Sequence, residues 1–275
     1  MIEAELPRIG RARGYRLYGL DGRRYLDFWQ ADGRALLGHR PAGAASAVKA
    51  AVDRGLWAEL PSVWNGRLER SLARYFQNSA GRSFRWFASE ERALAAASRL
   101  LGRPVEQAEP WSLPEGGRAE LVRWRPWWRG SDDRRLPPAA VVLPVLPFPA
   151  AFAPQLAVFE AGPAGEAAPA GDAVSPLLLA GLAAALAGLE AFGAKALPDW
   201  PAWRLRGFER RGPYLSAAYA PEKHAAVFAR LLKAGFVINP DPRRPSILPG
   251  EWSAGEKQLA ERAFAAAMEE ADAIR

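Results

Sequence analysis

Cysteine, histidine and lysine, the residues that most often act as nucleophiles, metal ligands or Schiff-base amines, are few in this chain of 275 residues. It has no cysteine, which excludes a disulfide framework and a thiolate metal site. Its only two histidines, His39 and His224, are isolated, so neither a zinc site nor a histidine relay beside Ser89 is favoured. Amine nucleophiles are equally scarce, and the five lysines are Lys49, Lys195, Lys223, Lys233 and Lys257. No Walker loop or dinucleotide-binding fingerprint is present.

The composition indicates a folded protein with a basic surface. The chain is 49% hydrophobic, and 11 tryptophans, 12 phenylalanines and 6 tyrosines are too much aromatic surface to leave in water. The formal net charge is +7, and five lysines among 37 basic residues leave 32 arginines. These arginines are spread without a long basic run, and threonine is absent, which favours a compositional bias over nucleic-acid binding.

Targeting and membrane signals are weak in this sequence. The N-terminal stretch MIEAELPRIG lacks the apolar segment of a signal peptide. The most hydrophobic run, residues 176–189, is too short to span a bilayer. The absence of cysteine fits a reducing compartment, so we expect a cytoplasmic protein.

Strands and helices alternate through the first 160 residues. Alternation of apolar and polar residues predicts strands at residues 16–20, 24–28, 83–87, 121–125, 141–146 and 155–159. The first two strands are joined by the turn signal Asp21-Gly22. Helical spacing of apolar residues predicts helices at residues 44–58, 65–77 and, capped by Ser89, up to about residue 101.

The remaining chain predicts a long helix followed by a smaller α+β part. Residues 161–173 form an Ala/Gly/Pro-rich segment that indicates a loop, and Ser175-Pro176 then starts an apolar helix. Strands are expected at residues 214–218, 235–239 and 246–248, and helices at 222–234 and, with a capping box from Ser253 to Glu256, up to about 273. The pattern predicts an α/β fold with a smaller α+β portion at the end.

The opening of the chain carries a motif. Residues 14–41, GYRLYGLDGRRYLDFWQADGRALLGHRP, resemble the start of class III aminotransferases and glutamate-1-semialdehyde aminomutases. Those proteins have an aromatic–Leu–x–Asp-Gly–x–x–Tyr-Leu-Asp-Phe run that ends in Gly-His-x-His-Pro. Further similar segments are SFRWFASEERALAAASRLLG (83–102), WWRG (127–130), QLAVFE (155–160), SPLLLAGLAAALAGLE (175–190), LLKAGFVINP (231–240) and SILPGEWSAGEKQLAERAF (246–264).

This resemblance implies a fold-type-I architecture of pyridoxal-phosphate-dependent transferases in a shortened form. We expect residues 1–50 to be the N-terminal segment of the small domain. An abbreviated large α/β domain should follow at residues 51–195, and a C-terminal small α+β domain at 196–275. Such proteins hold pyridoxal phosphate as a Schiff base on a lysine of the large domain, and they build their sites at a dimer interface.

Two groups that the resemblance requires for chemistry are missing. Alignment of QLAVFE places the Schiff-base lysine near residues 146–148, in VLPVLPFPAAFAP, where there is no lysine. Lys195 falls in the domain connection, and the other four lysines lie on helices with solvated faces. The acid that pairs with the pyridine nitrogen is missing too, because residues 137–158 contain no Asp or Glu.

The positions that would hold the cofactor phosphate and the substrate also differ. Glu90 and Glu91 follow Ser89 where a Ser-Gly-Thr turn would receive the phosphate, and their carboxylates repel a dianion. Trp128 and Arg129 fall where an aromatic residue stacks on the pyridine. Gly171 lies near the position of a phosphate-binding Thr supplied by the partner subunit. Ser246 stands where an arginine binds the substrate carboxylate, with Arg243 and Arg244 just upstream.

These departures leave three interpretations open. The first is an aminotransferase-like protein without transaminase activity or bound cofactor, acting as a structural or regulatory homodimer with a possible heteromeric protein partner. For the dimer we expect the apolar helix from Pro176 and the aromatic segment at residues 56–64 to expose apolar surface. The second is a divergent enzyme that binds pyridoxal phosphate. The third is a basic polyanion-binding protein.

Overall fold

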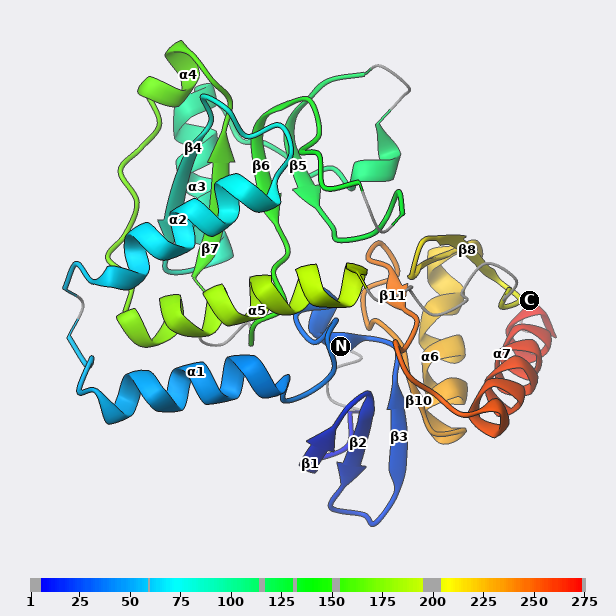
Figure 1. Ribbon diagram of the computed structural model, residues 1–275. Coiled ribbons are helices and arrows are strands. Elements are labelled where there is room, and N and C mark those ends of the chain that lie inside the picture. The colour runs from blue at the N-terminus through cyan, green and yellow to red at the C-terminus, as the bar shows by residue number, and fades with distance from the viewer. Residues whose placement is uncertain are drawn as a thin grey trace. The chain divides into compact units, whose positions relative to one another are not determined.

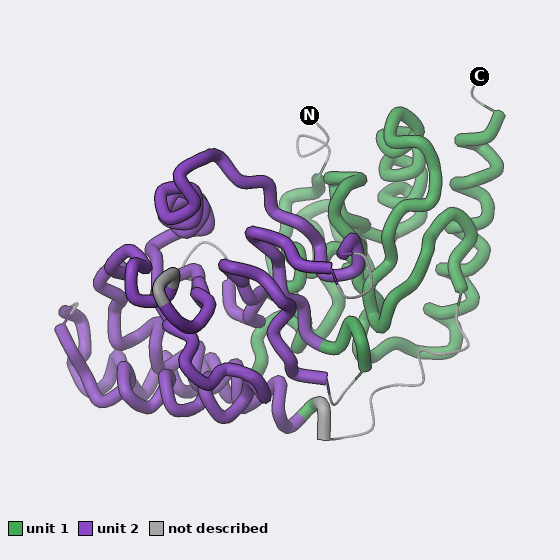
Figure 2. Tube along the Cα trace, turned by 90° about the horizontal axis from the view of Figure 1, so that it is seen from above, with its two compact units in different colours: residues 1–41, 127–130, 192–275 green, residues 42–126, 131–191 purple. Residues whose placement is uncertain are grey.

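The structure is a computed structural model, and it describes residues 6–58, 60–113, 117–130, 133–149, 154–194 and 204–273. Contacts divide the chain into two compact units, drawn in two colours in Figure 2. Unit 1 contains residues 1–41, 127–130 and 192–275, and unit 2 contains residues 42–126 and 131–191. The expected domain boundaries at residues 50 and 195 stay a prediction.

Unit 1 brings the two ends of the chain into one sheet. The strands, in spatial order, are β1 (Ile9–Arg13), β2 (Arg16–Gly19), β3 (Arg24–Asp27) and β10 (Phe236–Val237). The first three are antiparallel, whereas β10 pairs in parallel with β3, with Phe236 opposite Leu26. The predicted turn between β2 and β3 is confirmed, since the Asp21 carboxylate accepts hydrogen bonds from Arg23 N and Tyr25 Oη.

A second sheet and two helices complete unit 1. The antiparallel strands are β11 (Ser246–Ile247), β9 (Tyr214–Ala217) and β8 (Phe208–Arg211). The helices are α6 (His224–Lys233) and α7 (Ala254–Ala273). The predicted capping box is confirmed: Ser253 N donates to the Glu256 carboxylate, and Glu256 N donates to Ser253 Oγ. Phe28, Phe236 and Phe264 meet in a buried aromatic core.

Unit 2 is an α/β layer structure around one four-stranded sheet (Figure 1). The strands, in spatial order, are β4 (Ser83–Phe87), β7 (Gln155–Phe159), β6 (Ala139–Pro144) and β5 (Ala119–Trp124). Strand β7 is antiparallel to both neighbours, while β5 and β6 run in parallel. The helices are α1 (Ala42–Asp53), α2 (Val63–Tyr75), α3 (Glu90–Leu101), α4 (Pro163–Glu166) and α5 (Pro176–Ala194).

Side-chain alternation along the strands assigns different helices to the two faces of this sheet. Leu121 of β5 and Ala157 of β7 share one core cluster with Ala93 and Ala97 of α3. The next residue along β5 after position 123, Trp124, instead meets Tyr75 and Phe76 at the end of α2. Because successive residues of a strand point to opposite faces, α3 and α2 cover opposite faces of the sheet. The α/β class predicted from the sequence is confirmed.

The sequence analysis did not predict three elements, and its expectation for the exposure of α5 was wrong. Strands β1 and β8 were not predicted, because arginine-rich sequences such as IGRAR and FERR lack the usual apolar alternation. Helix α4 interrupts the expected loop at residues 161–173. The apolar residues of α5 are covered by the chain itself, so the expectation that this helix exposes a large apolar surface is wrong. The buried ones are Leu179, Ala180, Leu182, Ala185, Leu186 and Leu189.

No helix among the described residues is long and apolar enough to cross a bilayer. Short 3₁₀ turns occupy Gln30–Gly33, Pro110–Ser112 and Pro221–Lys223.

The capping glutamate of α7 also ties this helix to strand β2. Arg16 donates from Nε and Nη2 to the two Glu256 carboxylate oxygens at 2.8 and 2.7 Å. These bonds hold the pKa of Glu256 at about 2, far below its ordinary value of 4.5. A depressed folded-state pKa means that ionised Glu256 stabilises the fold above pH 4.5, and that this stabilisation is lost as the pH falls towards 2.

The Glu256→Gln substitution should therefore destabilise the protein in a pH-dependent way. We expect a loss of about 2 kcal/mol of unfolding free energy at neutral pH, because a charged, bidentate interaction is removed. Urea denaturation between neutral and acidic pH should show this difference shrinking as Glu256 protonates. Glu261→Gln, at an exposed position of the same helix, is the matched control and should change little. Equal stability of Glu256→Gln and the wild type at neutral pH would contradict this account.

Candidate functional site

Helix α3 begins at the end of strand β4, and its first turn is rich in carboxylates. Ser89 has an extended backbone, and its Oγ accepts a hydrogen bond from Arg92 N at 3.3 Å, as its predicted role as N-cap requires. Glu90 and Glu91 occupy the first turn, where negative charge suits the helix dipole. A hydrogen bond with Ser89 lowers the pKa of Glu91, so this carboxylate is ionised at neutral pH.

A third carboxylate, which the sequence analysis did not single out, lies at the same helix start. Asp172 accepts a hydrogen bond from Ala88 N at 2.8 Å and another from Arg92 Nε at 2.6 Å. The bond from Arg92, with that from Ala88, lowers the pKa of Asp172. Asp172 N in turn donates to Trp86 O at 2.7 Å, which fixes this segment against β4.

Gly171 is required where the chain passes strand β4. A Cβ added at Gly171 would lie 2.7 Å from Trp86 O, a distance too short for any other residue. The resemblance places a phosphate-binding Thr of the partner subunit near this position. Here Gly171 instead lies against the chain's own sheet, and it brings the Asp172 carboxylate to the start of α3.

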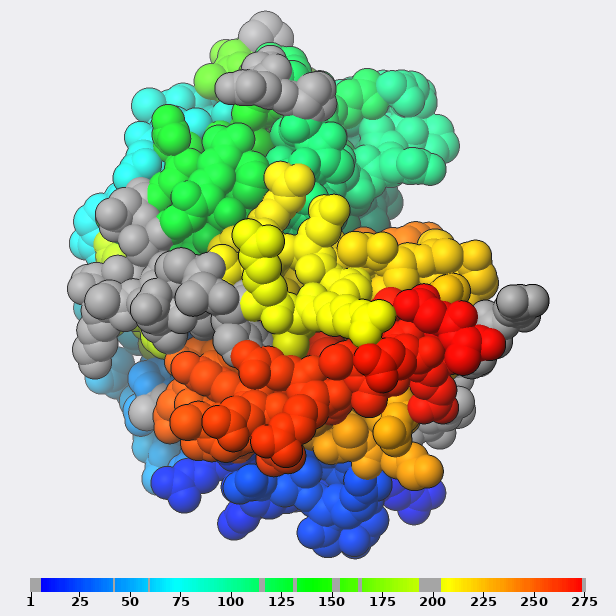
Figure 3. All heavy atoms as spheres, turned by 90° about the vertical axis from the view of Figure 1, so that its right-hand side faces the viewer, coloured from blue at the N-terminus to red at the C-terminus, as the bar shows by residue number. Residues whose placement is uncertain are grey.

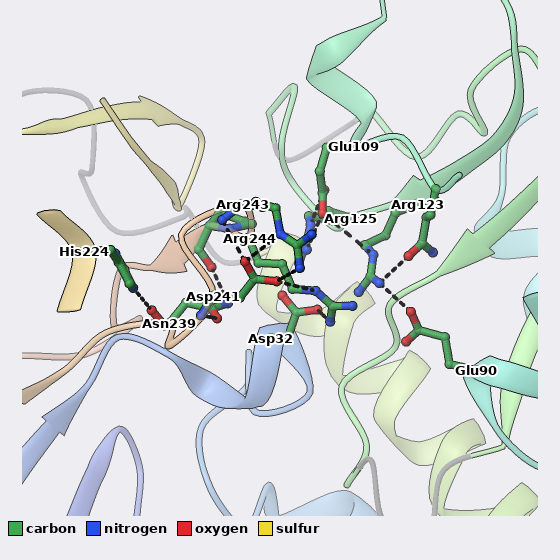
Figure 4. Close-up of polar contacts among 12 residues, drawn as sticks. Asp32, Glu90, Glu109, Arg123, Arg125, His224, Asn239, Asp241, Arg243 and Arg244 are labelled. Atoms are coloured by element: carbon green, nitrogen blue, oxygen red, sulfur yellow. Dashed lines mark hydrogen bonds and ion pairs between the residues drawn. The ribbon is translucent and has the colours of Figure 1, made fainter. Parts of the chain in front are cut away.

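Strand β5 and the residues just after it carry two buried arginines that pair with nearby carboxylates. The Arg123 side chain is 3% exposed, and its Nη2 donates to Glu90 at 2.5 Å and to Gln107 (Figure 4). Just beyond the strand, the Arg125 side chain is fully buried and donates from Nε and Nη2 to the Glu109 carboxylate at 2.6 and 2.7 Å. A charge removed from water must be paired, so these arginines fix the carboxylates around them.

The sequence analysis overlooked Arg123 and Arg125, although a signal was present. The segment LVRWR (121–125) places arginine at every second position among apolar residues. Charged residues at alternate positions of a buried strand indicate a paired interior cluster rather than a solvated face. Partners of these arginines include Glu90, Gln107 and Glu109, and Glu90 is distant from them in sequence.

Buried apolar side chains occupy the positions where the resemblance expects a lysine. Leu146 and Phe148 follow strand β6, and both are buried. The Phe148 ring packs so closely on α5 that a Cβ at Gly181 would lie 2.3 Å from it, and Val48 of α1 borders the same point. This part of unit 2 is therefore filled by close packing.

The remaining positions singled out in the sequence belong to unit 1. The Arg129 guanidinium lies 4.3 Å from the centre of the Trp128 ring, a cation–π contact. Ser246 is buried in β11, and its Oγ accepts a hydrogen bond from Asn239 N at 3.0 Å. Arg244 Nη1 donates to Asp32 at 2.9 Å, and Arg243 pairs with Asp241 at 3.0 Å (Figure 4).

A run of strained backbone follows strand β3 and was not predicted. Gln30, Ala31 and Asp32 have positive φ values of 50°, 47° and 59°, although none is glycine. The Asp27 carboxylate, which accepts from Trp29 N and Gln30 N, holds the run in place. The buried Gln30 amide adds bonds to the carbonyl oxygens of residues 247 and 248. Strain persists where several bonds over-determine it.

Both histidines have local hydrogen-bond partners. His39 Nε2 lies 2.8 Å from Asp27 Oδ2. His224 is buried, with Nδ1 at 2.9 Å from Tyr219 Oη and Nε2 at 2.9 Å from Asn239 O. Burial lowers the pKa of His224, so its imidazole is neutral at pH 7. Among the described residues, no group of three or more His, Cys, Asp or Glu side chains gathers as a metal site would require.

The four lysines that the structure describes lie on helix surfaces or on the turn before α6. Lys49 and Lys233 are exposed, Lys223 pairs with Asp272 at 2.8 Å, and Lys257 lies over the Trp252 ring. None of the four is buried, as an activated Schiff-base amine must be. Lys195 lies outside the described residues.

Sequence comparisons find relatives over most of the chain. No known protein-family model matches it. An uncharacterised protein of Treponema pallidum is 28% identical over 292 aligned positions, which cover 88% of this chain and 89% of that protein. A glutamate-1-semialdehyde 2,1-aminomutase of Syntrophus aciditrophicus is 33% identical over 96 residues, which is 34% of this chain and 22% of that enzyme.

Solved structures with the same fold are aminotransferases and aminomutases. An omega-transaminase from Sphaerobacter thermophilus superposes with a TM-score of 0.67 at 14% identity, covering 97% of this chain and 91% of the transaminase. A glutamate-1-semialdehyde aminomutase from Pseudomonas aeruginosa gives a TM-score of 0.65 at 14% identity, with 96% and 87% covered. The chain has the fold of fold-type-I pyridoxal-phosphate-dependent transferases. Within that fold it resembles a shortened class III aminotransferase or glutamate-1-semialdehyde aminomutase.

The buried arginines of β5 make a direct stability prediction. Glu109→Gln should cost about 3 kcal/mol of unfolding free energy, because it removes a charged partner from a fully buried guanidinium. Glu120→Gln is the matched control. Glu120 lies on β5, close in sequence to the buried arginines, and pairs with the exposed Arg103 at 2.7 Å. That surface pair should contribute about 0.5 kcal/mol. Urea denaturation of both variants checks the difference, and equal effects would show that Arg125 does not depend on Glu109.

Proposed function

We propose that this protein is an aminotransferase-like protein without transaminase activity, which acts in the cytoplasm as a structural or regulatory homodimer. The observation that carries the proposal is the packing after strand β6. Leu146 and Phe148 fill the region where a Schiff-base lysine is expected, and the close approach of Phe148 to Gly181 leaves little room for a cofactor ring. Without an amine at that point, an aldehyde cofactor has no covalent attachment of the family's kind.

The charge at the start of α3 supports the same proposal. A phosphate binds at a helix N-terminus because free N–H groups and the dipole favour an anion. Here Ser89 Oγ accepts a hydrogen bond from one of these N–H groups, Arg92 N. The Glu90, Glu91 and Asp172 carboxylates already supply negative charge at the helix start. Arg123 is committed to Glu90 and Gln107. Arg92 is likewise committed to Asp172, and the ionised Glu91 would repel a phosphate dianion, so the described residues do not fit the phosphate of the cofactor.

Pyridoxal phosphate should not form an internal aldimine with this protein. Titration followed by gel filtration should leave no visible absorption band on the protein, because the described lysines are on the surface and carboxylates occupy the helix start. Borohydride reduction and peptide mapping should find only trace labelling spread over several lysines.

Lys195 is the amine that this experiment must test separately, because it lies outside the described residues. The Lys195→Arg variant keeps the charge and removes the amine, and a glutamate-1-semialdehyde aminomutase treated in parallel is the positive control. Stoichiometric labelling of Lys195 in the wild type, absent from Lys195→Arg, would overturn the inactive assignment. It would favour the alternative of a divergent pyridoxal-phosphate enzyme.

The homodimer part of the proposal rests on exposed apolar side chains between α1 and α2. Trp57, Leu60 and Val63 are 71%, 67% and 65% exposed, although each is a large apolar residue. They fall within nine residues of one segment, the aromatic-rich stretch at 56–64. Clustered exposed apolar residues are typical of protein interfaces. A second copy of the chain is the partner that the resemblance to dimeric transferases favours.

The Trp57→Asp substitution should weaken this dimer. Analytical ultracentrifugation should find the wild type dimeric at micromolar concentration, and the variant should have a dissociation constant raised about thirty-fold or more, as for an interface hot spot. Leu259→Asp, which changes another large exposed apolar residue in α7, is the matched control and should leave the dimer intact. A monomeric wild type, or equal effects of both variants, would refute the proposed interface.

A further inference from the structure

Four arginines gather on one face of the N-terminal sheet. Cross-strand pairing places Arg13 opposite Arg16, Arg11 opposite Tyr18, and Tyr18 opposite Arg24. Residues that pair directly across antiparallel strands point to the same face, as do residues two apart on one strand. Arg11, Arg13, Arg16 and Arg24 therefore form one surface, which we call the arginine face. In sequence these residues are spread over fourteen positions, which is why no basic run was visible.

The arginine face is not explained by sheet stability. Like charges directly opposite each other on neighbouring strands are destabilising, and Arg13 and Arg16 are such a pair. Arg16 is neutralised by Glu256, whereas Arg11 and Arg13 have no carboxylate partner among the described residues. Arg24 is exposed, and its Nη2 lies 3.8 Å from Glu256. The arginine face thus has positive charge that carboxylates of the fold do not neutralise.

A hollow of about 540 Å³ lies against this face, next to the start of α7. Figure 3 shows the N-terminal strands in blue beside α7 in orange to red. The residues that line the hollow include Arg13, Arg16, Tyr18, Arg24, Glu251 and Glu256. Both Glu256 carboxylate oxygens accept hydrogen bonds from Arg16, so the Arg16 guanidinium is held in a fixed orientation at the hollow. A fixed arginine with further arginines beside it is a suitable arrangement for binding an anion.

We propose that the arginine face binds a compact anion that carries one or two phosphate groups. Guanidinium groups bind phosphate oxygens through paired hydrogen bonds, and the hollow has the size of a small-molecule site. One contact favours a small ligand over a nucleic-acid strand. The Tyr18 ring is already covered by the Arg11 guanidinium at 4.3 Å, so it does not offer a base a free stacking surface.

Isothermal titration calorimetry with pyrophosphate at low ionic strength tests this proposal. The wild type should bind one pyrophosphate per chain, and the double variant Arg13→Ala/Arg24→Ala should bind it about ten-fold or more weakly, because charged hydrogen bonds are lost. The matched control is Arg70→Ala/Arg99→Ala, which removes the same charge from exposed positions of unit 2. Circular dichroism should find all three proteins folded, since every substituted arginine is exposed.

The control should keep the affinity of the wild type. No heat of binding in the wild type, or an equal loss in both double variants, would overturn the proposal. A fluorescently labelled single-stranded oligonucleotide supplies the second comparison. Oligonucleotide binding that requires Arg13 and Arg24 but is not displaced by pyrophosphate would assign the face to nucleic acid and overturn the compact ligand. None of these results depends on whether pyridoxal phosphate binds elsewhere in the chain.

Discussion

The burial of two guanidinium groups at the end of strand β5 is the constraint around which unit 2 is organised. Arg123 and Arg125 cannot be buried as charges without partners, because the penalty for an unpaired buried ion exceeds what one packing contact returns. Glu109 is held at one of them and Glu90 at the other. Because Glu90 is also the first residue of α3, the same ion pair fixes the start of that helix relative to the sheet.

The fold and the start of α3 depend on different kinds of contact. The layer order of the sheet and its helices depends on apolar packing, which many sequences satisfy. The helix start and the segment after β6 depend on single side chains, and there this chain has carboxylates and buried apolar groups. The fold and the residues at these two places can therefore vary separately, since they depend on different side chains.

The arginines of the N-terminal sheet differ in burial and pairing from those of unit 2. In unit 2 Arg123 and Arg125 are buried and paired, whereas on the sheet of β1 to β3 Arg11, Arg13 and Arg24 are exposed and, among the described residues, only Arg16 has a close carboxylate partner. The first arrangement satisfies charge internally and supports structure. The second leaves charge available to solvent, which is how a protein attracts an anion without a long basic run in its sequence.

The sequence by itself determined the local elements. Strands β4 and β7 have the predicted bounds, Ser89 caps α3, and the Ser253–Glu256 capping box starts α7, because these features depend on residues a few positions apart. The resemblance also identified the fold, and it identified residues 146–148 as lacking a lysine. The tertiary structure alone decided the partners: Glu90 with Arg123, Asp172 with Arg92, and Arg16 with Glu256. Such pairs are separated by 33, 80 and 240 residues, and no local pattern encodes which distant charge a buried or oriented side chain will meet.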